Sequence, residues 1–330
     1  MVNIGDLLLA LYGATSGDIS ISKIKGAINQ AILCIRPDNF DTYFIKSLWE
    51  KHKEHILQTY LQGGQGNLSS EIVKNICFRF PNAKEQSKIS NLFQIIDERI
   101  ATQSKIIEDL TTLRSALYDS MFCSPEQETP TLRIPSFTGK WQQHQLNEIC
   151  TRKNIRNRDI SYSRVLTIAA QYGLVDQESF FKKRIASENL ESYLCLEKGD
   201  FAYNKSYSSD YPWGAVKRLL NFENGIISPL YICYTPNPEV VDSDYLAHYF
   251  ESTKWHSGIS DISGEGARNH GLLNMSVIDY FKTLHRIPSL DEQKEIAKRL
   301  NAIDYKLQVE HECLGLLKRQ KDGLLKQMFI

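Results

Sequence analysis

The sequence has no closely spaced cysteine pair, no long apolar run and no net charge. Its seven cysteines are scattered and odd in number, and its N-terminus lacks the basic start and cleavage site of a signal peptide, so we expect a reduced protein of the cytoplasm. No apolar run approaches the roughly 20 residues that span a bilayer. Thirty-nine basic residues balance thirty-nine acidic ones, so any affinity for nucleic acid must come from local patches.

Sequence motifs of enzymatic chemistry are also missing. There is no GxxxxGK[ST] loop for ATP and no Asn-Pro-Pro-aromatic or Asp-Pro-Pro-aromatic loop of an adenine methyltransferase. His52 with His55, and His311 with Cys313, have metal-like spacings but no second pair nearby, so we interpret them as surface residues. We therefore expect no catalytic, cofactor-binding or metal-binding residues in this chain.

What the sequence does contain is a long internal repeat. Residues 85–122 and 292–329 align without a gap and share Glu-Gln, Ile-Asp and a closing Met-Phe. In both copies apolar residues recur at alternating spacings of four and three, which is the pattern of a heptad seam. Two such seams in one chain most simply bury each other. The rows consist of Ile89, Phe93, Ile96, Ile100, Ile107, Leu110, Leu117 and Met121, and of Ile296, Leu300, Ile303, Leu307, Leu314, Leu317, Leu324 and Met328, with polar interruptions at Gln103, Arg114, Glu310 and Lys321.

Both repeats open with the same helix-start signal. A proline is followed by Asn82 with Glu85 in the first copy and by Ser289 with Glu292 in the second, and both are capping-box patterns. At 1.5 Å per residue each helix is about 57 Å long, which is more than a small domain needs for its own core. We expect the two helices to pack antiparallel within one chain.

The duplication extends into the segments before the helices. Gly5-Asp6 corresponds to Gly199-Asp200, and AINQAILCIRP corresponds to GIISPLYICYTP. The second domain has 58 residues from Trp141 to the residue before Gly199, whereas only four precede Gly5, so we expect the first domain to be N-terminally truncated. Short β-rich runs predict mixed α/β domains. The expected organisation is a partial first domain over residues 1–81, a first long helix over 82–122, a Pro-rich linker over 123–140, a second domain over 141–288 and a second long helix over 289–330.

The motifs that mark the repeat also carry a family resemblance. They are the paired P-x-x-x-E-Q helix openings, the endings ALYDSMF and LLKQMF, LRIPSFTGKW before the second domain, and ALYGATSGDISISKIKGAINQAILCI and FAYNKSYSSDYPWGAVKRL inside the domains. With them the chain resembles the specificity subunit of a type I restriction-modification enzyme. The resemblance implies an α+β fold with two α/β target-recognition domains, joined by two long helices packed as an antiparallel intramolecular coiled coil.

The resemblance also implies a function and a set of partners. The chain is expected to recognise a bipartite site in double-stranded DNA without catalytic activity, and to work with two methyltransferase subunits and two restriction (nuclease-translocase) subunits. S-adenosylmethionine, ATP and Mg would be held by those partner subunits only. A second copy of the chain is a further expected partner, because two chains could pair so that two intact domains face the DNA. The alternative is a coiled-coil scaffold or protein-binding adaptor without DNA specificity.

Candidate DNA contacts cluster in the second domain. Residues 151–184 hold eight basic residues against three acidic ones, and clustered Lys and Arg can neutralise phosphates or read guanine edges. NKSYSSDYPWGAVKR and GEGARNHG look like loops that present donors and aromatic rings. Solvated loops, packed aromatic residues and a simple glycine loop remain the alternatives. The candidates are Arg152, Lys153, Arg156, Arg158, Lys205, Tyr207, Trp213, Lys217, Arg218, Arg268, Asn269 and His270.

Overall fold

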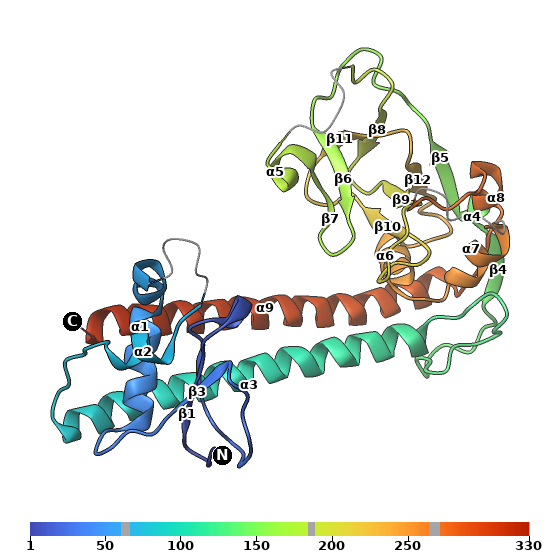
Figure 1. The fold of residues 1–330 in the computed structure, drawn as a ribbon. Helices are drawn as coiled ribbons and strands as arrows, with labels where there is room; N and C mark the ends of the chain where they lie inside the picture. The colour runs from blue at the N-terminus through green and yellow to red at the C-terminus, as the bar shows by residue number, and fades with distance from the viewer. Residues whose placement is uncertain (61–66, 184–188, 264–270, 330) are drawn as a thin grey trace. The chain divides into compact units, whose positions relative to one another are not determined.

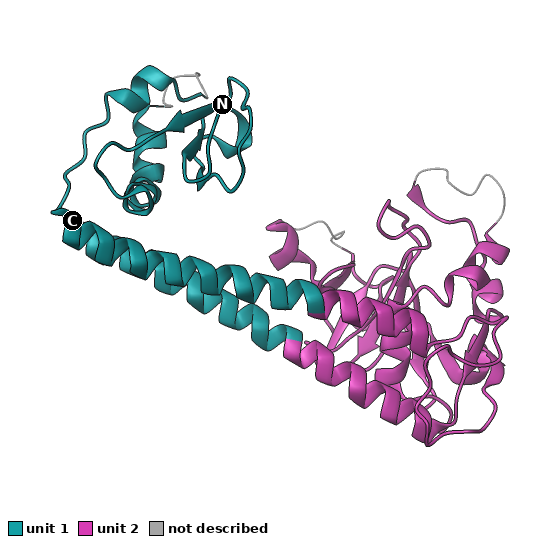
Figure 2. Ribbon diagram, turned by 90° about the horizontal axis from the view of Figure 1, so that it is seen from below, with its two compact units in different colours: residues 1–109, 307–330 teal, residues 110–306 magenta. Residues whose placement is uncertain are grey.

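The protein is described here by a computed structural model that covers residues 1–60, 67–183, 189–263 and 271–329. The chain divides into two compact units, one of residues 1–109 with 307–330 and one of residues 110–306 (Figure 2). We call them unit 1 and unit 2. Each unit takes part of both long helices, α3 (Ala83–Met121) and α9 (Leu290–Met328). Within the described residues, no helix is both long and apolar enough to cross a bilayer.

Unit 1 is built on a small antiparallel sheet with the strand order β2-β1-β3. The central strand reads LLLA because one face is fully buried, with Leu7 and Leu9 enclosed, and Leu8 on the other face is half-buried. Helix α1 (Thr42–Tyr60) packs one face into this unit. Its Trp49 indole donates to the Gly17 carbonyl at 2.8 Å. The elements are β1 (Leu7–Ala10), a 3-10 turn (Gly13–Thr15), β2 (Ile19–Ile21), β3 (Ile32–Ile35), α1 (Thr42–Tyr60) and α2 (Ser70–Lys74).

Unit 2 holds three sheets, with strand orders β10-β9-β12-β5, β7-β6-β11-β8 and β13-β4. The pairing of β6 with β11 is parallel and the other pairings are antiparallel. Its elements are β4 (Gln142–Gln145), α4 (Leu146–Ile149), β5 (Cys150–Lys153), β6 (Val165–Ala169), β7 (Gly173–Asp176), α5 (Gln177–Phe181), β8 (Leu194–Glu197), β9 (Phe201–Asn204), β10 (Ala215–Arg218), β11 (Asn224–Ile227), β12 (Ile232–Pro236), α6 (Ser243–Glu251), α7 (His256–Ile262), α8 (Val277–Phe281) and β13 (Leu284–Ile287). Among the described residues before α1, unit 1 has no counterpart of β5.

The core of unit 2 is rich in aromatic side chains. Tyr203 and Tyr280 stack with ring centroids 4.7 Å apart, and the Tyr280 hydroxyl lies 3.2 Å from the Tyr234 hydroxyl. Burial raises the pKa of both Tyr234 and Tyr280 well above the ordinary tyrosine value. The same core includes Phe122 at the end of α3 and Leu300 of α9, so the domain and its part of the helix pair share one hydrophobic interior.

Within each unit the parts of α3 and α9 run side by side in opposite directions (Figures 1 and 2). The apolar rows lie at this contact as predicted over most of their length, but Met328 is 36% exposed. At the helix end Leu325 and Phe329 are buried instead, and Phe329 packs on Phe44 of α1 with ring centroids 5.3 Å apart. The end of α9 therefore faces the domain helix α1, and its buried face has shifted by one residue.

The predicted polar interruptions pair with one another or with neighbouring carboxylates. In unit 1 the Gln103 amide donates to the Glu310 backbone carbonyl at 3.0 Å and to the Glu310 carboxylate. Lys321 lies 2.7 Å from the Asp97 carboxylate in the same unit. In unit 2 Arg114 lies 3.1 Å from Asp304. In the repeat Asp97 corresponds to Asp304, and Arg114 corresponds to Lys321. Both units therefore use the same two repeat positions for an ion pair, with the roles of the two helices exchanged.

The Glu-Gln motif at each helix start has two different uses. Gln293 is fully buried; its side chain accepts from the Asp242 N–H at 2.8 Å and donates to the Pro288 carbonyl at 3.0 Å. Gln86 makes the equivalent bonds to Asp41 and Pro81. The capping-box reading of Glu292 is wrong: this buried carboxylate accepts from Arg133 and from the Trp141 indole. The linker and the second domain thus converge on the start of α9.

Candidate nucleic-acid interface

The basic segment of unit 2 begins on β5, an edge strand that pairs antiparallel with β12. Successive side chains of a strand point to opposite faces, which separates Arg152 from its neighbour Lys153. Arg152 is exposed, whereas the Lys153 side chain is only 14% exposed. Two neighbouring cations in the sequence therefore meet different surroundings.

Lys153 serves the fold of unit 2. Its ammonium lies 2.9 Å from Asp200 and 3.2 Å from Glu197. Burial lowers the pKa of Lys153, but the bonds to these carboxylates outweigh burial and the pKa lies above its ordinary value. Asp200 is 2% exposed and also accepts from the Glu197 N–H at 2.7 Å.

The same Gly-Asp turn occurs in unit 1 with a different cation. Gly5 and Gly199 have φ values of +93° and +95°, a backbone conformation that glycine adopts without steric cost. Asp6 takes the place of Asp200, and hydrogen bonds from Arg36 lower the pKa of Asp6 to about 2. A buried or half-buried carboxylate at this turn thus has a cationic partner in both units. Because the two turns are equivalent, we interpret Lys153 as the structural partner of the turn and not as a free surface cation.

Two more candidate cations join β10 to α6. Lys217 forms an ion pair with Glu251, and Arg218 lies 2.6 Å from Asp244. Both side chains are only 11 to 12% exposed. Burial raises the pKa of Asp244, but Arg218 outweighs it and the pKa lies below its ordinary value. In this structure these two cations hold a helix on the sheet.

The aromatic candidates pack partly into the domain. Tyr207 and Trp213 both lie half-buried against the hydrophobic core of unit 2. The Trp213 carbonyl accepts from the Tyr203 hydroxyl at 2.8 Å, and the Tyr207 N–H donates to the Gly271 carbonyl at 3.1 Å. They anchor the loop between β9 and β10. Arg268, Asn269 and His270 lie outside the described residues.

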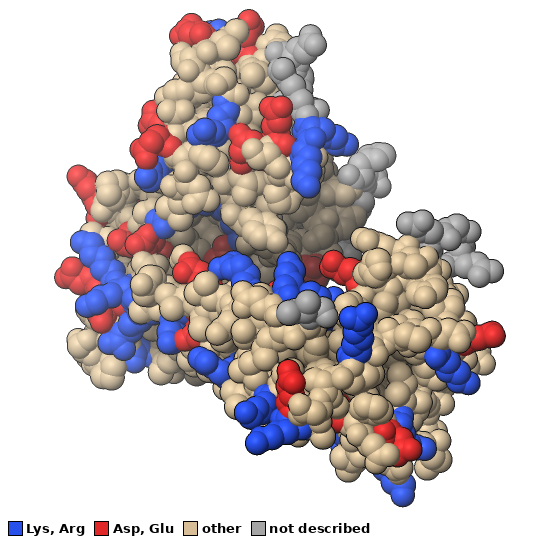
Figure 3. Space-filling view, turned by 90° about the vertical axis from the view of Figure 1, so that its left-hand side faces the viewer, with Lys and Arg blue, Asp and Glu red and all other residues tan. Residues whose placement is uncertain are grey.

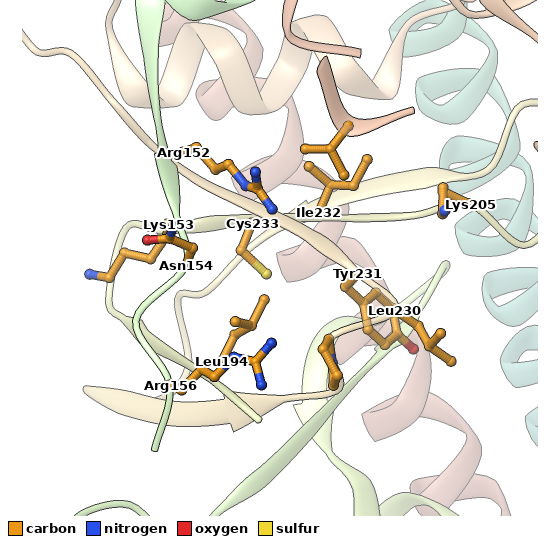
Figure 4. Close-up of a pocket in the computed structure, with 12 residues that line it drawn as sticks. Arg152, Lys153, Asn154, Arg156, Leu194, Lys205, Leu230, Tyr231, Ile232 and Cys233 are labelled. Carbon is orange, nitrogen blue, oxygen red and sulfur yellow. The ribbon is translucent and has the colours of Figure 1, made fainter. Parts of the chain in front are cut away.

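Four candidate cations have no carboxylate partner among the described residues: Arg152, Arg156, Arg158 and Lys205. Three of them, Arg152, Arg156 and Lys205, line one cavity of about 310 Å³ in unit 2. Figure 4 shows Arg152 and Arg156 along one side of this cavity and Lys205 with Tyr231 on the other. Arg158 is exposed but does not line the cavity, and its contact with DNA stays a prediction.

Sequence reasoning missed other residues of this cavity. Asn154 is exposed beside Arg152, and Leu230 and Tyr231 belong to the turn before β12. Asn154 carried a signal, because its amide lies inside the basic run RKNIRNR, whereas the turn carried none. Over the face shown in Figure 3, basic and acidic side chains are interspersed, so this cavity differs from that surface by its single sign of charge. No described group of three His, Cys, Asp or Glu side chains is placed to hold a metal ion.

Comparison with known proteins relates the first part of the chain to a protein family. A family model described as "Type I restriction modification DNA specificity domain" matches residues 2–112, which include the described sheet of unit 1 and most of α3. The first part of the chain is thus similar to the DNA specificity domain of type I restriction-modification enzymes. A relative from Methanocaldococcus jannaschii, the type I restriction enzyme MjaVIII specificity subunit, is 23% identical over 98% of this chain and 78% of its own length.

Solved structures from type I restriction-modification systems share the fold. A type I restriction-modification S subunit from M. genitalium matches 99% of this chain and 83% of its own, with a TM-score of 0.59 and 17% identity. A chain from a structure of type I R-M complex assembly and conformational transition matches with a TM-score of 0.57 and 14% identity, over 99% of this chain and 82% of its own. These matches confirm the predicted α+β fold, in which domains are joined by long helices.

Proposed function

We propose that this chain is the DNA sequence-recognition subunit of a type I restriction-modification complex. The observation that carries the proposal is the specificity-domain match over unit 1 together with the second use of its motifs in unit 2. The Gly-Asp turn and the buried glutamine at the helix start recur with the same contacts in both units. A unit used twice fits a target with two short recognised sequences separated by an unread gap.

In this proposal the chemistry belongs to other subunits. The cavity of unit 2 is lined by cations, an amide and apolar side chains, and none of its lining residues is a carboxylate that could act as a general base. Methyl transfer with S-adenosylmethionine, and ATP-driven translocation with cleavage, would take place on two methyltransferase subunits and two nuclease-translocase subunits. This chain would select the DNA site and provide the scaffold on which those subunits assemble.

Methylation mapping tests the proposal directly. The chain is expressed with its methyltransferase subunit in cells free of other methyltransferases, and modified adenines are mapped across the genome. The expected result is a bipartite motif with a gap of fixed length. Exchanging residues 141–287 for the corresponding domain of a relative should change one half of the motif and leave the other unchanged. Methylation that does not depend on this chain, or that keeps both halves after the exchange, would favour the scaffold alternative.

A further inference from the structure

The cavity beside β5 combines like charges on fixed backbone. Arg152 lies on β5, where it is the register partner of Tyr234 in β12. Around Arg156 the Ile155 carbonyl accepts from the Cys195 N–H at 2.8 Å, and the Asn157 N–H donates to the Tyr193 carbonyl at 3.0 Å. The Lys205 carbonyl accepts from the Leu273 N–H at 2.9 Å. Three cations are thus presented from backbone that a strand or main-chain hydrogen bonds already hold in place.

These cations have no counter-charge within the cavity. None of the residues that line it is acidic, and Lys153, the fourth cation, is already held by Asp200 and Glu197. Like charges in one recess repel one another, and this repulsion is larger where protein displaces water. Elsewhere in unit 2 the buried or half-buried cations Lys217 and Arg218 do have carboxylate partners. Arg152 and Arg156 are exposed and Lys205 is half-buried, so all three stay open to an anion from outside.

We infer that Arg152, Arg156 and Lys205 form a cradle for the phosphodiester backbone of DNA. Guanidinium and ammonium groups only donate hydrogen bonds, and phosphate oxygens only accept them. A base edge in the major groove offers donors as well as acceptors, so a lining dominated by donors suits the backbone better. The Asn154 amide adds the same kind of donor at the wall. Because the donors stand on fixed backbone, binding has to order their side chains but not the main chain.

This inference rests on the proposed function and makes it more specific. Phosphate contacts position a protein on the duplex without reading sequence, so the cradle would set where unit 2 lies on DNA. Base contacts would then come from other residues of the domain. Removing a cradle cation should weaken binding to every duplex by the same factor, whereas removing a base contact should change the preferred sequence.

The test uses the complex of the full chain with its methyltransferase subunits. Binding is measured over a salt titration on two duplexes, one with the mapped motif and one scrambled. Arg152→Gln, Arg156→Gln and Lys205→Gln are compared with Lys140→Gln, an exposed lysine of the same unit that does not line the cavity. Arg152→Lys keeps the charge, and thermal melting shows whether each variant is folded.

Each cradle variant should reduce the slope of log K against log salt by about 0.9 and weaken both duplexes about five- to tenfold at 0.1 M salt. Lys140→Gln should leave the slope unchanged, and Arg152→Lys should keep it. The triple variant combines Arg152→Gln, Arg156→Gln and Lys205→Gln. An unchanged slope in the folded triple variant would overturn the cradle, as would a variant that relaxes the sequence preference at one base pair. If the wild-type complex binds no duplex, the proposed function itself fails.

Inorganic phosphate distinguishes DNA from a free anion as the source of the phosphate group. Isothermal titration of the DNA-free complex with phosphate should show at most weak binding, because a single small anion forgoes the contacts of the flanking backbone. Tight binding of phosphate that the triple variant loses, combined with an unchanged DNA salt slope, would reassign the cavity to a free anion and overturn the DNA assignment.

Discussion

Arg152 and Lys153 are adjacent and chemically similar, yet the structure gives them different roles. Lys153 neutralises the buried Asp200, whereas Arg152 faces a cavity with no acidic lining. In unit 1 Arg36 takes over the first role beside Asp6. Local positive charge in the sequence therefore overestimates the number of residues available to DNA.

Lys153→Ala should destabilise the protein. It should leave the salt dependence of DNA binding unchanged. The change leaves the Asp200 carboxylate buried with less compensation, so we expect the free energy of unfolding to fall by about 3 kcal/mol. Lys198→Ala removes the exposed pair with Glu223 and should cost under about 1 kcal/mol. Denaturant unfolding measures both values, and adding Asp200→Asn to Lys153→Ala should restore much of the loss. Equal costs for the two lysines would contradict the assignment.

Sequence reasoning located the basic segment but could not sort its cations. The partners of Lys153, Lys217 and Arg218 lie dozens of residues away in the chain, and the sheets of unit 2 bring them together. The aromatic candidates Tyr207 and Trp213 likewise support the fold as well as the loop. Which residues remain available is decided by tertiary pairing, which a local pattern does not contain.

At the scale of elements, the polar positions of α3 and α9 act on the register of the helix pair. A heptad seam by itself permits slippage by seven residues, because every repeat offers a similar apolar surface. Pairing Lys321 with Asp97 and Arg114 with Asp304 is satisfied in one register only. The polar interruptions thus exchange some stability for a defined alignment.

Asp97 gives this alignment a pH dependence. Burial raises the pKa of Asp97, but hydrogen bonds from Lys321, Lys46 and Tyr43 outweigh burial and hold it below its ordinary value of 3.8. A depressed carboxyl pKa contributes stability that is complete above pH 3.8 and is lost as the pH falls through the folded value. Asp97→Asn should lower the free energy of unfolding by about 2 kcal/mol at neutral pH. Urea unfolding should show this difference narrowing below about pH 4; a constant difference would argue against the mechanism.

Gln293 joins the start of α9 to the domain in front of it. Gln293→Leu would leave the half-buried N–H of Asp242 and the carbonyls of Val240 and Pro288 without this partner. We expect the free energy of unfolding to fall by about 2–3 kcal/mol. Gln308→Leu, at an exposed position of the same helix, should change it by less than about 0.5 kcal/mol. A thermal melt of both variants compares them, and similar melting temperatures would show that the joint is unimportant.

The helices were the most predictable elements because their signals are local and repeated. Heptad spacing located the buried rows, and the proline before each start located the first turn. The exposure of Met328 was not predictable, since at its end α9 packs on α1 as well as on α3. The use of Glu292 by Arg133 was also hidden, because the linker that supplies Arg133 has no periodic pattern.

At the scale of the whole molecule, the repeated contacts predict two equivalent partner sites. The buried glutamine at the helix start, Gln86 or Gln293, and the polar pairing of the helices occur once in each unit. A subunit that recognises this arrangement would therefore find it twice. We expect one copy of this chain with two methyltransferase subunits. Native mass spectrometry of the co-expressed complex measures the ratio, and a single methyltransferase per chain would contradict equivalence.

The division of both long helices between the two units has a consequence for synthesis in the cell. Unit 1 needs residues 307–330, yet residues 110–306 must be translated between its two parts. At 5–20 residues per second, the first 109 residues wait roughly 10–40 s for the segment that supplies Leu325 and Phe329 to their core. During that interval the chain is still on the ribosome, and the apolar face of α3 lacks the part of α9 that covers it in the folded unit. The nascent chain should therefore depend on chaperones more than its modest size would suggest.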